Sequence, residues 1–339
     1  AKTHVLFVAG PPSHGWGEHE HPAGSALLAT ALTNSSPDFT AEVSEGWPTD
    51  PRLLDRADTL VMYGDGLEHH VARGHLPELR RYVGQGRGLV VLHWALESGL
   101  GELGDFFLDH LGGRFEVDWS VNPMWTLEDP TIVPHPVTSG VNPFSLYEEF
   151  YFHLRFHDDA CPVLTAHPPA DTLGDSDGPR SGNPTIRCAL AEGRPQTLAF
   201  AFEKAGARAF GCTGGHFHRS WADDDFRKLI LNAIVWTAGR DVPAAGIASS
   251  VDPIPQHETI EKAIALGDLA DVQRQVAAHP DRLQAGTHPS LTPLHQAILR
   301  KKTEIACWLA EQGADVDRPD GSARSALHLA VERNDVRVL

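Results

Sequence analysis

The sequence predicts an α/β domain built on a mostly parallel sheet flanked by helices, followed by a smaller all-α region of repeats. Three observations predict this fold class. Short apolar segments alternate with helix-like segments through the first part of the chain, a stretch rich in Pro, Gly and Ser follows residue 238, and a short motif recurs beyond it. At 339 residues, the chain is also long enough for two domains.

Four short apolar segments are expected to be buried strands, namely residues 5–9, 59–62, 89–92 and 208–212. Three other segments have the apolar spacing of helices, namely residues 24–32, 76–83 and 223–236. This alternation is typical of a parallel sheet whose faces are covered by crossover helices. Residues 171–184 have no apolar period and are expected to form a long loop or insertion within this domain.

The expected organisation is an α/β domain at residues 1–240, a linker at 241–256 and repeats at 257–339. Two six-residue segments support the repeats, Thr292-Pro293-Leu294-His295-Gln296-Ala297 and Ser325-Ala326-Leu327-His328-Leu329-Ala330, which are 33 residues apart. Their period and sequence resemble ankyrin repeats. About three repeats are expected, the first degenerate and the last incomplete, with His295 and His328 hydrogen bonded inside their own turns.

Composition excludes several classes of protein. The formal charge is −17 and no run of Lys or Arg occurs. This excludes a protein that binds nucleic acid by neutralising its phosphates, so no nucleic-acid partner is expected. No segment reaches the roughly 18 apolar residues of a membrane helix, so no membrane partner is expected either. The four cysteines form no C-x-x-C pair. We expect a soluble protein of the bacterial cytoplasm or periplasm, and a removed signal peptide keeps both compartments open.

Histidine is the compositional anomaly, with 20 residues in the chain. Each expected strand is followed by histidine: His14, His19 and His21 after the first, His69 and His70 after the second, His93 after the third, and His216 and His218 after the fourth. Because the carboxyl ends of parallel strands line one crevice, these imidazoles are expected to converge. Converging imidazoles bind divalent transition metals, so the sequence predicts such a metal, zinc foremost, with manganese and cobalt as alternatives.

Residues 146–156 show a second polar pattern. Their alternation puts Glu149, Tyr151, His153 and Arg155 on one face of an expected strand. A carboxylate, a phenol and a guanidinium together suit proton transfer and orientation of a hydroxylated ligand, although the polar face of an edge strand is the plain alternative. Three tryptophans offer either stacking surfaces for a sugar or core packing: Trp94, Trp119 and Trp125.

Several motifs of the first domain resemble those of the ThuA-like (trehalose utilisation) family, namely residues 17–21, 91–97, 119–123, 181–184 and 214–218. The resemblance spans residue 3 to about residue 240 and implies the class I glutamine-amidotransferase-like fold. Related proteins of that fold carry a cysteine nucleophile where this chain has His93, so glutamine hydrolysis through a thiolate is excluded.

The resemblance also implies a site. Its expected metal ligands are His19, His69, His93 and His216, with His70 competing for the place of His69. Its expected catalytic residues are Glu149, Tyr151, Arg155 and His218. Members of the family accompany sugar oxidoreductases, which implies action on 3-keto-glycosides.

The leading hypothesis is therefore a metal-assisted enzyme that cleaves or isomerises a 3-keto-glycoside, with a small sugar as substrate. The alternative is a non-catalytic sugar-binding or sensing module whose ankyrin repeats recruit a protein partner. A third reading makes the repeats a brace on the first domain without an outside partner.

Overall fold

The computed structural model describes residues 2–338, which divide into two compact units, Ala1–Val251 and Asp252–Leu339. Residues 241–251, the first part of the predicted linker, belong to the first unit. Their backbone binds to helix α6 (Asp224–Thr237): the Ile247 amide donates to Asn232 Oδ1 over 2.8 Å, and Arg227 Nη2 donates to the Ser249 carbonyl over 2.8 Å. Polar side chains of α6 therefore hold residues 241–251 against the first unit, although the composition of this segment predicts only a linker.

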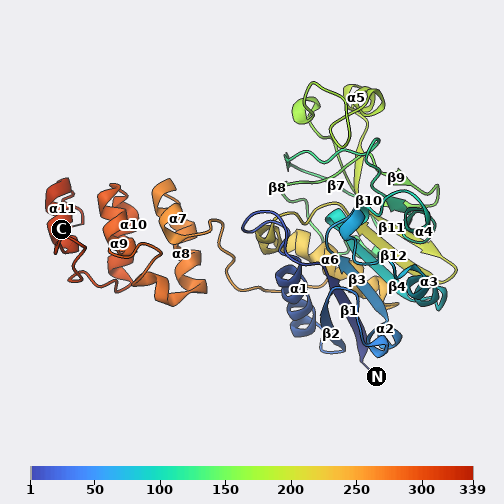
Figure 1. Cartoon of the computed structure of the whole chain (residues 1–339), viewed down its shortest axis with the longest axis horizontal. Coiled ribbons are helices and arrows are strands. Elements are labelled where there is room, and N and C mark those ends of the chain that lie inside the picture. The colour runs from blue at the N-terminus through green and yellow to red at the C-terminus, as the bar shows by residue number, and fades with distance from the viewer. Residues whose placement is uncertain (1, 339) are drawn as a thin grey trace. The chain divides into compact units, whose positions relative to one another are not determined.

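An eight-stranded sheet forms the centre of the first unit (Figure 1). In spatial order its strands are β2 (Phe39–Glu45), β1 (Thr3–Ala9), β3 (Thr59–Tyr63), β4 (Gly88–Leu92), β12 (Ala207–Cys212), β11 (Gln196–Lys204), β10 (Cys161–Ala166) and β7 (Thr131–Ile132). The first five strands are parallel, and the last three add on in antiparallel fashion. The predicted mostly parallel sheet is confirmed, and the four predicted strands are its neighbouring strands β1, β3, β4 and β12.

Helices cover both faces of this sheet. Helices α1 (His21–Ser35) and α6 pack on one face and contact each other. On the other face, α2 (Pro51–Arg56), α3 (Leu76–Gly84) and α4 (Glu102–His110) share one apolar cluster with alternate residues of the central strands. Burial of β3 and β4 on both faces explains why these strands are uninterrupted apolar segments.

The strand predicted at residues 146–156 is wrong in its extent. Only its two ends are strands: β8 (Leu146–Glu148) pairs with β6 (Trp125–Leu127), and β9 (Arg155–Phe156) pairs with β5 (Gly113–Arg114). Between them the chain turns, with His153 in the left-handed region at φ 59°. Phe150 and Phe152 are fully buried, so packing of these aromatic rings outweighs the alternation.

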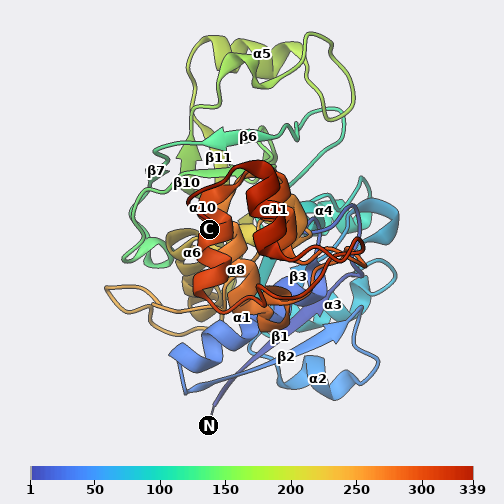
Figure 2. The same ribbon diagram turned by 90° about the vertical axis from the view of Figure 1, so that its left-hand side faces the viewer.

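Residues 171–184, predicted as a loop or insertion, lead into the short helix α5 (Pro184–Ala191). Figures 1 and 2 show that α5 and its flanking loops project away from the sheet. Asn183 caps α5 by accepting a hydrogen bond from the Ile186 amide. Its side-chain amide also donates to the Trp119 carbonyl over 2.8 Å, which fastens the insertion to the loop before β6.

The second unit consists of α7 (Ile260–Leu266), α8 (Leu269–Ala278), α9 (Pro293–Leu299), α10 (Thr303–Glu311) and α11 (Ala326–Arg333), stacked around one apolar core (Figure 1). The residues that precede α7, α9 and α11 are Thr259, Thr292 and Ser325, so 292 − 259 and 325 − 292 both give a period of 33. Thr292 forms a capping box with His295, and Ser325 forms one with His328. The predicted turn role of both histidines is confirmed.

Replacing Thr292 with alanine is expected to lower the free energy of unfolding of the second unit by about 1–2 kcal/mol, because the side chain that accepts from the His295 amide is lost. Urea unfolding of the full chain would measure it. Thr287→Ala is the matched control, since only the backbone of Thr287 takes part in the hydrogen bonds of the described residues. Equal loss in both variants would contradict the capping role.

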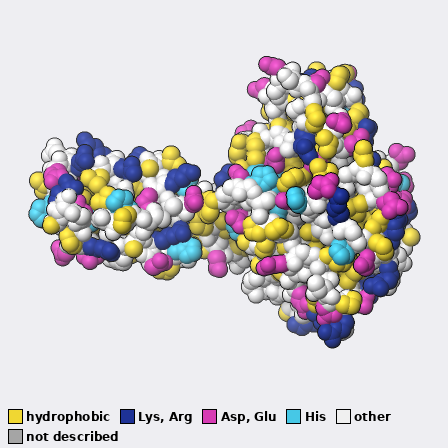
Figure 3. Space-filling view, in the orientation of Figure 1, with side chains coloured by type: hydrophobic (Ala, Val, Ile, Leu, Met, Phe, Trp, Pro, Cys, Tyr) yellow, Lys and Arg dark blue, Asp and Glu magenta, His cyan; other side chains and the backbone are white. Residues whose placement is uncertain are grey.

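None of the helices in residues 2–338 combines the length and apolar character needed to cross a bilayer. Figure 3 shows basic and acidic side chains interspersed over the visible face of each unit.

Candidate metal centre

The side chains that follow β1, β4 and β12 meet at the carboxyl edge of the parallel strands, as the sequence predicts. The turn after each strand delivers one imidazole: His19 from the loop after β1, His93 directly after β4, and His216 after β12. His19 and His93 adopt left-handed backbone conformations, with φ of 46° and 53°. Such strain in residues other than glycine is typical of functional turns.

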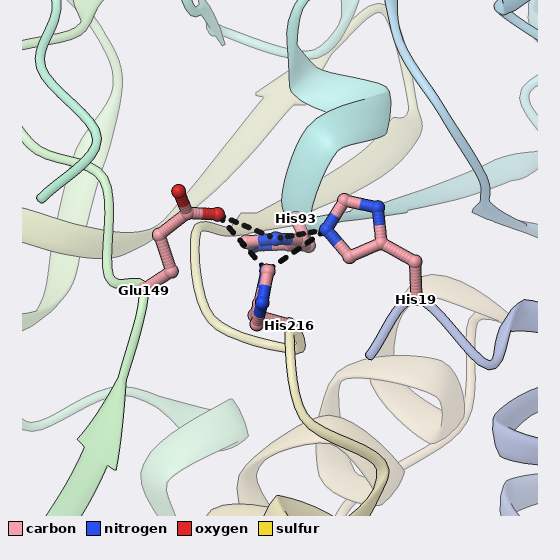
Figure 4. Close-up of side chains that lie close together, drawn as sticks. All are labelled: His19, His93, Glu149 and His216. Atoms are coloured by element: carbon pink, nitrogen blue, oxygen red, sulfur yellow. Dashed lines mark hydrogen bonds and ion pairs between the residues drawn. The ribbon is translucent and has the colours of Figure 1, made fainter. Parts of the chain in front are cut away.

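Three imidazoles and one carboxylate converge in a compact cluster (Figure 4). His19 Nε2 lies 3.2 Å from His93 Nε2 and 2.9 Å from His216 Nδ1. Glu149 Oε2 closes the ring, 3.3 Å from His93 Nε2 and 3.1 Å from His216 Nδ1. All three imidazoles are buried, and the Glu149 side chain is only 13% exposed. We call these four residues the His3Glu cluster.

The hydrogen bonds behind two of the imidazoles fix which nitrogen faces the cluster. His93 Nδ1 lies 2.7 Å from the Thr213 carbonyl, which can only accept, so Nδ1 carries the hydrogen and Nε2 carries a lone pair. His19 Nδ1 lies 3.3 Å from Asp65 Oδ1, which gives the same tautomer. Two lone pairs therefore face each other beside a carboxylate, and they cannot hydrogen bond to one another.

This arrangement fits a divalent cation. A tetrahedral ion bound to nitrogen and oxygen at about 2.0–2.2 Å places its ligands about 3.3 Å apart. The neighbouring atoms of the His3Glu cluster are separated by 2.9–3.3 Å. Imidazole suits zinc and cobalt, and a carboxylate among the ligands also suits manganese.

Burial adjusts the protonation of the cluster toward metal binding. Burial lowers the pKa of His19 to about 3 despite its hydrogen bond to Asp65, so the imidazole is neutral near pH 7. Burial alone would raise the pKa of Asp65, but hydrogen bonds from His19 and Ser13 lower it below its ordinary value. A neutral imidazole backed by an ionised carboxylate is the usual arrangement around a metal ligand.

Tyr151 and Asn122 border the cluster. Tyr151 Oη lies 3.1 Å from His93 Nε2, and its ring stacks on that imidazole. Burial raises the pKa of Tyr151 well above its ordinary value, so the hydroxyl keeps its proton and donates. Asn122 Nδ2 donates to Glu149 Oε1 over 3.1 Å, which turns the other carboxylate oxygen toward the imidazoles.

The structure places His69 and His70 outside the cluster. His69 is exposed at the end of a short 3-10 helix, Leu67–His69. His70 is buried, but Nε2 contacts the Ala95 carbonyl and Nδ1 accepts from the Ala72 amide, so the backbone occupies both nitrogens. The tight turn after β3 carries both side chains past the cluster, and Glu149 takes the fourth place.

Arg155 and His218 also lie outside the His3Glu cluster. The Arg155 guanidinium lies 3.6 Å from the centre of the Trp119 ring and pairs with Glu116 over 3.2 Å. His153 stacks on the same tryptophan. Side chains of this chain therefore cover the Trp119 ring, which the sequence suggested as a stacking surface for a sugar. His218 begins a 3-10 helix, and its amide donates to the Gly17 carbonyl over 2.8 Å, which positions the loop that carries His19.

Of the other two tryptophans, Trp125 is buried and donates to the Phe150 carbonyl over 2.9 Å, as a core residue does. Trp94 is half-buried, and its ring centre lies 5.5 Å from those of His14 and His19. Only Trp94 of the three lies beside the cluster and retains the stacking role as an alternative.

Three supporting residues were not predicted: Ser13, Asp65 and Glu148. Asp65 comes two residues after β3, so the rule that selected the histidines would have found it. Glu148 is fully buried and accepts from the His216 amide over 2.8 Å. The alternation of residues 146–156 separates Glu149 from Glu148, but it does not predict that the buried Glu148 supports the backbone of His216.

Replacing Asp65 with asparagine is expected to weaken metal binding about 10- to 100-fold, because the side chain that orients His19 loses its charge. Competition with a chromophoric chelator would measure the affinity. Asp58→Asn is a matched control, since Asp58 accepts from the His4 amide at the opposite end of β1. Unchanged affinity in the Asp65 variant would contradict the supporting role.

The fold and this edge site define an α/β protein with a buried imidazole and carboxylate centre, followed by helical repeats. The chain belongs to the ThuA family, described as trehalose utilisation, whose model matches residues 4–237. An ankyrin-repeat model matches residues 294–339. Both resemblances predicted from the sequence are confirmed.

Solved structures with a similar fold include a ThuA-like protein from Bacteroides uniformis, at 16% identity and a TM-score of 0.47, covering 71% of this chain and 92% of that one. A cytoplasmic protein from Salmonella typhimurium has 13% identity and a TM-score of 0.42, covering 70% and 98%. The carbohydrate deacetylase Agd3 has 13% identity and a TM-score of 0.41, covering 70% and 32%. A comparison with curated proteins found no match.

Proposed function

We propose that this protein is a metal-dependent enzyme that cleaves the glycosidic bond of 3-keto-glycosides in sugar utilisation. The observation that carries the proposal is the His3Glu cluster, whose buried lone pairs converge within about the spacing that a zinc-like ion imposes. Membership of a family described as trehalose utilisation supports a sugar as substrate.

The chemistry follows from the ketone. A 3-keto group acidifies the proton at C2, and loss of that proton allows the substituent at C1 to leave by elimination. A bound divalent metal supplies Lewis-acid polarisation of the ketone. Water then adds at C1 to complete hydrolysis.

This chain's residues have separate tasks in the scheme. The sequence left removal of the C2 proton to Glu149 or a histidine, and the contacts of Glu149 with His93 and His216 support a role for it as a metal ligand. Tyr151 keeps its proton because it is buried, so it donates to the leaving oxygen. The turns after β1, β4 and β12 hold the imidazoles before substrate arrives, and this preorganisation favours catalysis.

The test combines metal analysis with turnover in one preparation. The purified protein should contain a divalent transition metal, and mass spectrometry should show cleavage of 3-keto-trehalose or another 3-keto-disaccharide. Chelation should abolish turnover, and zinc, manganese or cobalt should restore it. Full turnover by metal-free protein would overturn the role of the metal. A metal-loaded protein inactive on every 3-keto-disaccharide would overturn the enzymatic role.

The ankyrin repeats favour one second candidate, a non-catalytic sugar-binding module that recruits a protein partner. This candidate predicts sugar binding without turnover. Ankyrin repeats usually provide a protein-binding surface, so we propose a protein partner for the second unit under either function.

A further inference from the structure

A second polar group lies beside the His3Glu cluster, on the loop after β1. Its members are Ser13, His14 and Asp65, with His19 shared between the two groups. His14 is exposed, unlike the three imidazoles of the cluster. Its ring centre nevertheless lies 3.9 Å from that of His19 and 5.9 Å from that of His216. His14 is therefore a solvent-accessible imidazole at the rim of the proposed metal centre.

Hydrogen bonds in this group have one consistent assignment. Ser13 Oγ lies 2.7 Å from Asp65 Oδ1, and because the carboxylate only accepts, the hydroxyl must donate to it. The serine oxygen is then left as an acceptor for His14 Nδ1, which lies 3.1 Å away. His14 thus carries hydrogen on Nδ1 and a lone pair on Nε2, which has no hydrogen-bond partner among residues 2–338.

This arrangement orients the imidazole of His14 as a base. A carboxylate that acts through a hydroxyl fixes the tautomer and leaves Nε2 free, as carboxylates do for histidine in hydrolases. The same carboxylate orients His19 directly over 3.3 Å. Asp65 therefore holds one imidazole for the metal and, through Ser13, a second imidazole beside it.

The other reading of this group is a second metal site, because ligand atoms of His14, His19 and Asp65 lie within 4.8 Å of one another. Ser13 Oγ argues against an ion there. It lies 3.1 Å from Nδ1 of both imidazoles and 2.7 Å from the carboxylate, so the hydroxyl already satisfies all three groups. The hydrogen bonds favour proton transfer over metal binding.

We infer that His14 is the proton carrier of this site and that Ser13 and Asp65 position it, an inference that rests on the proposed function. Nε2 of His14 takes the C2 proton, the C2–H electron pair forms the C2–C3 double bond, and the carbonyl pair moves to O3. When the carbonyl at C3 reforms, the C2–C3 pair becomes a C1–C2 double bond, the C1–O bond breaks, and the leaving oxygen takes its proton from Tyr151. A water molecule then gives a proton to the Tyr151 oxygen, and its hydroxide bonds to C1. The C1–C2 double bond opens, and His14 returns a proton to C2.

Three variants of the full chain test this inference on 3-keto-trehalose. His14→Gln should retain the metal and lower kcat about 100- to 10,000-fold, with part of the activity restored by added imidazole. Ser13→Ala should lower kcat less, by about 10-fold, since it removes only the orienting hydroxyl. His167→Gln, which replaces another exposed imidazole of the first unit, should match the wild type.

Two further measurements make the outcome decisive. In D2O, the wild-type product should carry deuterium at C2, and His14→Gln should lose this incorporation together with turnover. Normal kcat and deuterium incorporation in His14→Gln would overturn the inference. A metal content that falls from two ions to one in His14→Gln would overturn it in favour of the second metal site.

Failure of the proposed function remains distinguishable. If the wild type cleaves no 3-keto-sugar, the proposed function fails, and long-range proton–nitrogen NMR of the zinc-loaded protein still tests His14. The spectrum should show hydrogen on Nδ1 of His14, and Ser13→Ala should change this tautomer. A wild-type tautomer with hydrogen on Nε2 would overturn the assignment of His14 as a base.

Discussion

Replacing His93 with alanine is expected to release the metal and to abolish turnover of 3-keto-trehalose. His93 Nε2 lies at the centre of the contacts, within 3.3 Å of His19, Glu149 and Tyr151. Loss of an orienting residue behind a ligand already weakens metal binding 10- to 100-fold, so loss of a ligand should weaken it by more than about 100-fold. Metal analysis after gel filtration and mass spectrometry of the product measure both effects.

His216→Ala should behave in the same way, because its Nδ1 contacts both His19 and Glu149. His69→Gln is the matched control, since it changes a histidine that the sequence predicts as a ligand and the structure places in solvent. It should retain metal and turnover. Full metal content and full turnover in both alanine variants would refute the His3Glu cluster as the functional centre.

Much of the fold follows from the sequence because the central strands are buried on both faces. A continuous apolar segment such as residues 59–62 or 89–92 has little alternative to a parallel strand between crossover helices. Parallel strands also end at one edge, so histidine after each of four strands was sufficient to predict that imidazoles converge. This reasoning needs no knowledge of side-chain positions.

The choice of individual ligands could not be made in the same way. His19, His93 and His216 are brought together, but a strand end fixes only where the chain leaves the sheet. The turn after β3 directs His69 to solvent, and no periodicity reports the direction of such a turn. Glu149 enters the cluster from outside the sheet, on a segment whose path is set by the burial of Phe150 and Phe152.

The orienting residues show a second limit of sequence reasoning. Histidine is conspicuous because this chain has 20 of them, several at strand ends, whereas Ser13 and Asp65 are ordinary residues in a polar loop and a turn. Their importance comes from sharing one hydrogen-bond network with His14 and His19. Only the three-dimensional structure reveals such a network, because Asp65 lies 52 residues beyond Ser13 and 46 residues beyond His19 in the chain.

The adjacent carboxylates Glu148 and Glu149 are expected to respond in opposite ways to the same substitution. Glu148 is fully buried and accepts from the amides of Glu149 and His216 and from the Ser220 hydroxyl. Glu148→Ala leaves these donors buried without an acceptor, so the metal-free protein should lose about 3–5 kcal/mol of unfolding free energy. The backbone of His216 should also shift, and metal affinity should fall with it.

Glu149→Ala should instead leave the metal-free protein within about 1 kcal/mol of the wild type, while metal affinity falls by more than about 100-fold. In the metal-free cluster, Glu149 lies beside the lone pairs of His19 and His93, and its removal costs mainly the hydrogen bond from Asn122 and the contact with His216 Nδ1. Urea unfolding of chelator-treated protein, followed by zinc titration, separates stability from affinity. Equal losses of stability in the two variants would refute the division, because they would make both carboxylates supports of the fold rather than one support and one metal ligand.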